Sequence, residues 1–187
     1  GISAAANGNE ADGYKQYAAN GAIEVKLSDT VSIDLRGYYA HSRADLDGFP
    51  PPFYSLSDTP EYSTGQQVIG YASINASFGD LQNRTARTVN DINRDNFAAP
   101  GAAAPDFLSR GRTERFEYQG DRQLAQPLRP VFGVEHERSR FTDGFAPAKT
   151  RHSGAYAQAT SDPTEKLTIT AGASGKDHKR FGTQTTF

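Results

Sequence analysis

Cysteine, methionine and tryptophan are all absent from this sequence of 187 residues. Without cysteine the chain can form neither a disulfide nor a thiolate metal site. Long apolar runs are missing as well, and none approaches the roughly 20 residues that a membrane helix needs. The formal net charge of −2 provides no dominant basic face. We therefore predict no nucleic-acid partner.

Polar residues mixed with glycine and aromatics make up most of the chain. Hydrophobic residues account for only 36%, and the mean hydropathy is −0.67, yet there are 18 glycines, 9 tyrosines and 11 phenylalanines. Strands in which every second residue is polar produce such an average. Composition alone leaves a soluble all-β domain, or a partly disordered polar one, open.

Apolar and polar residues alternate along eight segments of the chain. In the first hairpin Ile23, Val25 and Leu27 alternate with polar residues, and the alternation resumes at Val31. The segments are separated by short turns near 28–30, 79–83, 125–129 and 161–165, and by long loops near 43–65, 95–112 and 142–150. Short and long connections in strict succession are typical of transmembrane barrels. We predict one all-β domain over 1–187, an antiparallel up-and-down transmembrane β-barrel segment of about eight strands, with a soluble β domain as the alternative.

Two local features qualify this pattern. Pro50-Pro51-Pro52 and Asp58-Thr59-Pro60 are expected to exclude regular pairing in the first long loop. Arg87, Arg122 and Thr160 fall on the predicted apolar face. An arginine that faces lipid near the midplane costs roughly 2–4 kcal/mol.

Several segments, taken in order, resemble those of TonB-dependent outer-membrane receptors, close to the cobalamin transporters and their siderophore-receptor relatives. They are 9–14, 35–39, 57–62, 115–119, 154–158, 167–172 and 177–182. Members of that family have a plug domain followed by a barrel of twenty-two strands, so the resemblance implies a segment of barrel wall with the plug outside this chain. One departure is Ala173-Ser174-Gly175-Lys176, where related receptors carry an arginine.

The resemblance implies import of cobalamin or a siderophore-like metal chelate across the bacterial outer membrane. The implied partners are outer-membrane lipid, a corrinoid or metal-chelate ligand, and TonB acting through the absent plug. Two alternatives stay open: a stand-alone eight-stranded structural or adhesive barrel, with which the final Phe187 agrees, and a solubilised engineered derivative. We predict no enzyme, because the sequence contains no nucleophile elbow, no phosphate-binding loop and no zinc motif among its four histidines.

Carboxylates gather where strands meet the predicted long loops. Calcium takes six to eight oxygen ligands, several of them carboxylate. Cobalamin transporters bind calcium with loop acids in corresponding places, so the resemblance assigns calcium to Glu10, Asp12, Asp47 and Asp58, with Asp45 as a spare. The alternative is that these loop acids are simply solvated, and the sequence establishes no other cofactor.

Loop aromatics are the candidates for contact with a large, partly apolar ligand. They are Phe49, Phe53, Tyr54, Tyr62, Phe97 and Phe107. The alternative is an interfacial girdle, which also places aromatics near strand ends. The polar residues Asp34, Arg36, Glu117 and Asp121 are predicted to line the lumen, where they contact either a plug or water.

Overall fold

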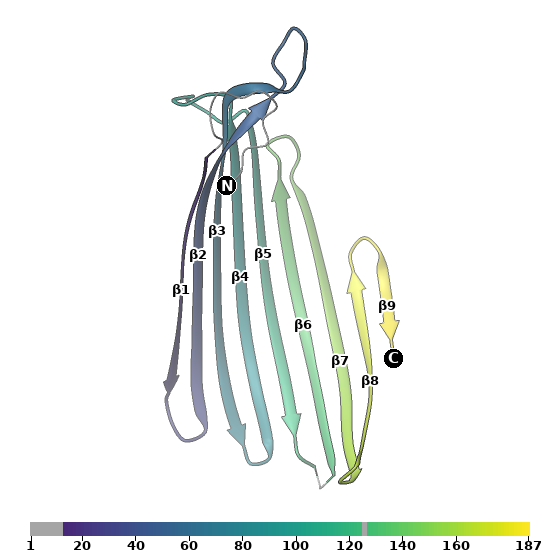
Figure 1. Cartoon of the computed structure of the whole chain (residues 1–187). Coiled ribbons are helices and arrows are strands. Elements are labelled where there is room, and N and C mark those ends of the chain that lie inside the picture. The colour runs from purple at the N-terminus through teal and green to yellow at the C-terminus, as the bar shows by residue number, and fades with distance from the viewer. Residues whose placement is uncertain (1–12, 125–126) are drawn as a thin grey trace.

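The computed structural model describes residues 13–124 and 127–187, in which all regular structure is antiparallel β-sheet (Figure 1). The strands are β1 Tyr14–Lys26, β2 Val31–Gly48, β3 Ser57–Phe78, β4 Leu81–Phe97, β5 Phe107–Arg122, β6 Leu128–Thr142, β7 Ala148–Thr164, β8 Leu167–His178 and β9 Gly182–Thr186. Among these residues no helix has the length and apolar character needed to span a bilayer.

Each strand pairs with the next one along the chain, giving a sheet in the order β1 to β9. The predicted all-β, antiparallel, up-and-down arrangement is confirmed. Within the described residues the sheet is open, because β1 and β9 each pair with a single neighbour. The predicted number of eight strands is wrong: β9 pairs with β8 from Ser174↔Thr186 to His178↔Gly182. The sequence pattern missed β9 because it contains no large apolar side chain to alternate with polar ones.

The strands reach further into the expected loops than the prolines suggested. Gly48 pairs with Ser57 and Leu46 with Glu61, with a register irregularity between them. The segment 58–60 is the additional length on β3, so Pro60, which has no N–H to donate, needs no ladder partner there. Regular pairing is thus absent at 58–60, as expected, although these residues lie within β3 and not in the loop. Pro50-Pro51-Pro52 does lie in the connection, which covers 49–56.

The two longest connections lie at the same rim of the sheet. Loops 49–56, 98–106, 143–147 and 179–181 join strands at the rim where β1 begins, whereas turns 27–30, 79–80 and 165–166, and the described residues 123–124 and 127, lie at the other (Figure 1). The turn at 79–80 is a two-residue hairpin in which Gly79 takes a φ of 59°. Such tight hairpins need a residue with positive φ, and glycine adopts it without strain. We call the first the loop rim and the second the turn rim.

The loop at 143–147 is closed by its first residue. The Asp143 carboxylate accepts hydrogen bonds from the backbone N–H groups of Phe145 at 3.1 Å and Ala146 at 3.2 Å. Because these donors favour the charged form, they hold the pKa of the Asp143 carboxyl below its usual value. These hydrogen bonds therefore fix the first half of the loop that joins β6 to β7.

The register separates the side chains into an apolar and a polar face. Val25, Ile33 and Ile74 lie in one row across β1, β2 and β3. The apolar face further contains Ile23, Leu35, Val68, Ala72, Val89, Phe116, Tyr118, Phe132, Val134, Ala155, Ala157, Ala171 and Ala173. Large side chains on this face stay exposed, among them Ile23 at 62% and Ile74 at 53%. The sheet therefore presents an apolar surface that no part of the described chain covers.

The buried residues of the described chain are small. They are Ala40, Ser73 and Ala86, which lie on the polar face, and the glycines Gly48, Gly120 and Gly133. A two-layer domain would instead bury its Ile, Val, Leu and Phe side chains. The sheet is thus joined by its backbone ladders rather than by a core of its own.

The structure shows the positions of the polar residues that the sequence pattern placed on the apolar face. Arg122 pairs with Leu81 at the turn rim, away from the middle of the face. Thr160 lies on the polar face, where its hydroxyl is 3.2 Å from that of Thr170, so its predicted placement is wrong. The apolar positions of β7 are the odd-numbered alanines, which leaves Thr160 opposite.

Arg87 does lie on the apolar face, beside Ala72 and Phe116. Its Nη2 reaches Glu114 Oε2 at 3.2 Å. Glu114 pairs with Val89, one step nearer the loop rim on the same face. The side chain therefore carries its charge away from the apolar middle, as long basic side chains do at interfaces.

Gly133 in β6 is predicted to tolerate no side chain. A Cβ there would lie 2.6 Å from the Tyr118 carbonyl oxygen and 2.7 Å from the Tyr156 ring. We expect Gly133→Val to lower the free energy of unfolding by about 1–3 kcal/mol, because strand or ring must move. Urea unfolding of the chain in detergent micelles measures this. The control is Gly37→Val, whose Cβ would meet nothing within 4 Å; equal midpoints for the two variants would contradict the packing described.

Candidate functional site

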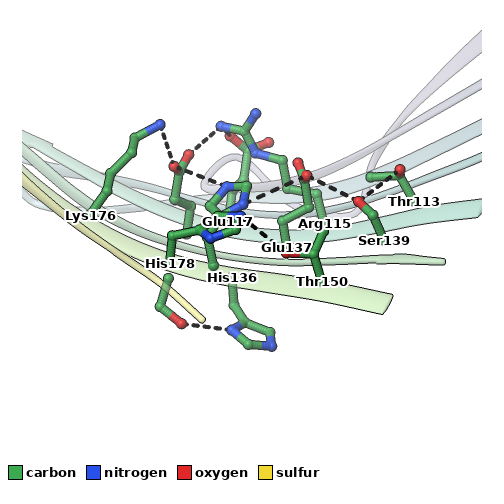
Figure 2. Close-up of polar contacts among 12 residues, drawn as sticks. Thr113, Arg115, Glu117, His136, Glu137, Ser139, Thr150, Lys176 and His178 are labelled. Carbon is green, nitrogen blue, oxygen red and sulfur yellow. Dashed lines mark hydrogen bonds and ion pairs between the residues drawn. The ribbon is translucent and has the colours of Figure 1, made fainter. Parts of the chain in front are cut away.

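The polar face carries a connected set of charged side chains centred on Glu135 of β6. Figure 2 shows Arg115, Glu117 and Lys176, which belong to this set. Arg115 of β5 forms an ion pair with one carboxylate oxygen of Glu135, and Lys176 Nζ of β8 lies 2.9 Å from the other. Arg115 also contacts Glu117 Oε1 at 3.0 Å. A single carboxylate thus joins cations from two strands that are not neighbours.

Glycine in the intervening strand makes this reach feasible. Glu135 pairs with Gly154 of β7, which pairs in turn with Lys176 of β8. A Cβ at Gly154 would lie 3.1 Å from both Cγ and Oε1 of Glu135. Because that position is empty, the Glu135 side chain lies over β7 and meets Lys176 beyond it.

His152 and Glu137 extend the cluster toward the loop rim. His152 Nε2 lies 3.8 Å from Glu135 Oε1, and His152 Nδ1 lies 3.8 Å from Glu137 Oε1. Both contacts are ion pairs when the imidazole is protonated. Ser139 Oγ donates to Glu137 Oε1 at 3.4 Å. The rings of His152 and His178 stack with centroids 6.3 Å apart.

The charges in this cluster are close to balance. Three carboxylates, from Glu117, Glu135 and Glu137, face Arg115, Lys176 and one imidazole. The Glu135 side chain is only 11% exposed, against 39% for Arg115. The carboxylate of Glu135 is thus nearly covered and held by two cations, whereas the cations themselves are more exposed and can meet solvent or a facing surface.

On the described part of the apolar face one serine contacts a histidine, but the histidine does not activate this serine as a nucleophile. His136 Nδ1 lies 2.8 Å from Ser153 Oγ, while Arg138 Nε–H donates to His136 Nε2 at 3.0 Å. Because Nε2 accepts that hydrogen bond, the neutral ring carries its proton on Nδ1 and donates to the serine. His136 in this form cannot remove the proton of Ser153, so the pair does not form a catalytic couple.

The residues predicted to line the lumen lie on the polar face, each beside an arginine. Asp34 accepts from Arg36, Asp121 pairs with Arg129, and Glu117 contacts Arg115. Arg36 also lies over the Tyr71 ring, at 5.4 Å from its centroid. The polar face is thus a surface of paired charges along much of its length.

Two of the four predicted calcium ligands lie within the residues that the structure describes. Glu10 and Asp12 lie outside these residues, while Asp47 is in β2 and Asp58 at the start of β3. Asp45 N–H donates to the Gly13 carbonyl at 2.9 Å, and Asp45 Oδ1 lies 3.1 Å from Arg43 Nε. In residues 13–124 and 127–187 no group of three or more His, Asp or Glu side chains is placed to hold a metal ion. The calcium site stays a prediction.

The aromatic ligand candidates fall into two groups. Tyr62 and Phe97 stack with centroids 4.8 Å apart and planes at 12°, and Arg43 lies 3.9 Å above the Tyr62 ring. This stack belongs to strand ends on the apolar face. The others are the exposed rings of Phe49, Phe53 and Tyr54 in loop 49–56, and Phe107 at the start of β5. Ligand contact stays a prediction for all six.

Sequence reasoning missed the site centred on Glu135. It assigned Glu135 to no predicted site, and it noted Lys176 only as part of a departure from a family pattern. The missing link was the pairing of both residues with Gly154. Counting residues outward from the 165–166 turn could have suggested which residues of β7 and β8 are paired. That count fails because the register shifts between Ser161 and Thr164.

Comparison with known proteins identifies the fold. No protein-family model and no curated protein sequence matches the chain. Among solved structures, the siderophore receptor PirA from Pseudomonas aeruginosa matches with a TM-score of 0.73 at 11% sequence identity. The match covers 92% of this chain but only 29% of that receptor. The sheet therefore has the fold of a segment of that receptor.

Glu135 is predicted to contribute more to stability than its neighbour Glu117. We expect Glu135→Gln to cost about 1–3 kcal/mol of unfolding free energy, because it leaves both Lys176 and Arg115 without their covered counter-charge. Glu117→Gln, which removes one contact with Arg115, is the control with a smaller expected loss. Chemical unfolding in micelles measures both.

A second substitution tests the assignment of partners. Lys176→Met in the Glu135→Gln background should recover part of the loss, because it removes the unpaired cation. A double-mutant cycle gives the coupling. Independent effects of the two changes would show that the pair does not interact.

Proposed function

We propose that this chain is a wall segment of an outer-membrane receptor that imports a metal chelate of the siderophore class. In this proposal the apolar face contacts lipid and the polar face lines the lumen. The plug and the remaining strands belong to the rest of the receptor, and TonB acts through that plug. The observation that carries the proposal is the continuous, uncovered apolar face of an up-and-down sheet.

The height of the apolar face supports a bilayer as its environment. On β3 the face runs from Val68 to Phe78, a rise of about 33 Å at strand geometry. With a tilt near 40°, common in membrane barrels, this gives a band about 25 Å tall, which equals the usual apolar band of outer-membrane barrels. Patches of such size are rare on soluble monomers.

The two faces then have separate tasks. The paired charges of the polar face, including those around Glu135, present a hydrated wall that a polar plug surface can contact. The exposed rings of Phe49, Phe53 and Tyr54 in loop 49–56 are the candidates for an apolar part of the chelate. Cobalamin as the particular cargo, with calcium on Glu10, Asp12, Asp47 and Asp58, is the narrower form of the proposal and rests on the sequence resemblance.

Tryptophan scanning tests the orientation, since the chain has no tryptophan of its own. In bilayers that contain brominated lipid, the fluorescence of Ile74→Trp should be strongly quenched. That of Asn75→Trp, one residue further on the polar face, should be nearly unaffected. Equal quenching at both positions would rule out a lipid-facing apolar face and with it the proposed receptor wall.

Calcium and cobalamin titrations test the narrower form. In the receptor that contains this chain, Asp12→Ala and Asp47→Ala should each weaken calcium binding, measured by calorimetry, and cobalamin binding in the presence of calcium. Asp29→Ala, at the turn rim, is the control and should leave both unchanged. If the affinities of all three variants equal that of the parent receptor, the calcium assignment is wrong, whereas the wall proposal is unaffected.

A further inference from the structure

Basic side chains form two rows on the apolar face, close to the loop rim. Arg112 of β5 pairs with Arg140 of β6, which pairs with Lys149 of β7. In the adjacent row Glu114 of β5 pairs with Arg138, which pairs with Arg151. Like charges directly opposite each other on neighbouring strands destabilise a sheet. A row of three cations with a row of two beside it therefore calls for a compensating anion.

The carboxylates of the described chain do not supply that compensation. Glu114 Oε1 lies 2.8 Å from Arg112 Nε, and Asp91 Oδ2 lies 3.9 Å from Arg112 Nη1. Both therefore serve Arg112. In residues 13–124 and 127–187 no ion pair reaches Arg140, Lys149 or Arg151. All three side chains are exposed.

A hollow lies over the row of three. It has a volume of about 250 Å³, and the charged residues that line it are the basic Arg110, Arg112, Arg140 and Lys149 and the acidic Asp91. Arg110 is already engaged, with Nη2 at 2.6 Å from Asp95 Oδ1. The positive charge in the hollow that has no ion-pair partner therefore comes from Arg140 and Lys149. Arg112, beside them, is already paired with Glu114 and Asp91.

The hollow is placed where lipid headgroups begin. On β6 the apolar residues Phe132 and Val134 are followed on the same face by His136, Arg138 and Arg140. Arg138 lies about 13 Å, and Arg140 about 20 Å, beyond Val134 along the strand. The cations thus lie on the lipid side of the sheet, above its apolar band and toward the loop rim.

From these observations we infer that the hollow binds the phosphate group of a lipid in the outward leaflet. Arginine offers planar pairs of N–H donors that match phosphate oxygens, and lysine adds a point charge. One phosphate between Arg140 and Lys149 offsets the repulsion along the row. The inference rests on the proposed function, since only a membrane-embedded apolar face brings lipid phosphate to this height.

The test uses the receptor that contains this chain, in phosphatidylcholine nanodiscs with diphosphoryl lipid A added as the phosphate-bearing probe. We expect the Arg140→Gln/Lys149→Gln double variant to bind the probe at least about tenfold more weakly than the parent receptor, as the loss of charge-assisted hydrogen bonds implies. Arg122→Gln, on the same face at the turn rim, should bind like the parent. Lipid A without its phosphates should bind the parent as weakly as the phosphorylated form binds the double variant.

Three results would overturn the inference. One is equal affinity of parent and double variant for diphosphoryl lipid A. Another is equal affinity of the parent for the phosphorylated and dephosphorylated lipids. The third is displacement of the lipid by inorganic pyrophosphate at the same concentration as by lipid A, which would identify a site for free anions. Flotation of the receptor with the bilayers separates these outcomes from failure of the proposed function, because a receptor that does not float has no lipid-facing band at all.

Discussion

The pairing of backbone N–H and C=O groups across neighbouring strands is the constraint on which the rest of this structure depends. Once Val25 is opposite Ile33 and Ile33 is opposite Ile74, parity alone assigns every other side chain to one face or the other. A slip of a single residue would exchange the faces completely. The apolar surface and the charged wall are therefore two results of one register, and neither can change without the other.

This constraint also explains how a sheet with so little interior can be specific. No large side chain is buried in the described residues, so packing of a core cannot select the register. Selection falls instead to cross-strand pairs, such as Glu135 with its cations, and to the medium on the apolar side. In a bilayer an unpaired backbone group costs several kcal/mol, which makes full ladders obligatory. The same sheet in water would have no comparable penalty for opening its edges.

Much of the fold follows from the sequence, since the alternation at Ile33, Ile74 and Phe116 already separates the faces. The pattern fails where alternation has no apolar member, as in β9, and where a proline is accommodated by an irregular register, as at Pro60. Loop lengths were overestimated because polar strand ends beyond the apolar band look like loops in a sequence. Those same ends are paired in the structure, where hydrogen-bonding takes no account of side-chain polarity.

The charged cluster was less accessible to sequence reasoning than the fold. Its members come from β5 to β8, and their meeting depends on Gly154 and on the register shift between Ser161 and Thr164. A count from the turn at 165–166 without that shift would place Lys176 on the wrong face, because one residue inverts the alternation. Irregularities of this kind depend on backbone geometry, and no residue pattern at Asp162-Pro163 states on which strand the additional residue lies.

Position along the strand, rather than face alone, decides what a charge on the apolar side does. Arg87 lies within the apolar band and extends toward the loop rim, where Glu114 receives it. Arg140 and Lys149 lie beyond the band, and they remain side by side without a carboxylate. Under the proposed function these positions lie on the two sides of one edge of the apolar band, with Arg87 inside the band and Arg140 and Lys149 outside it.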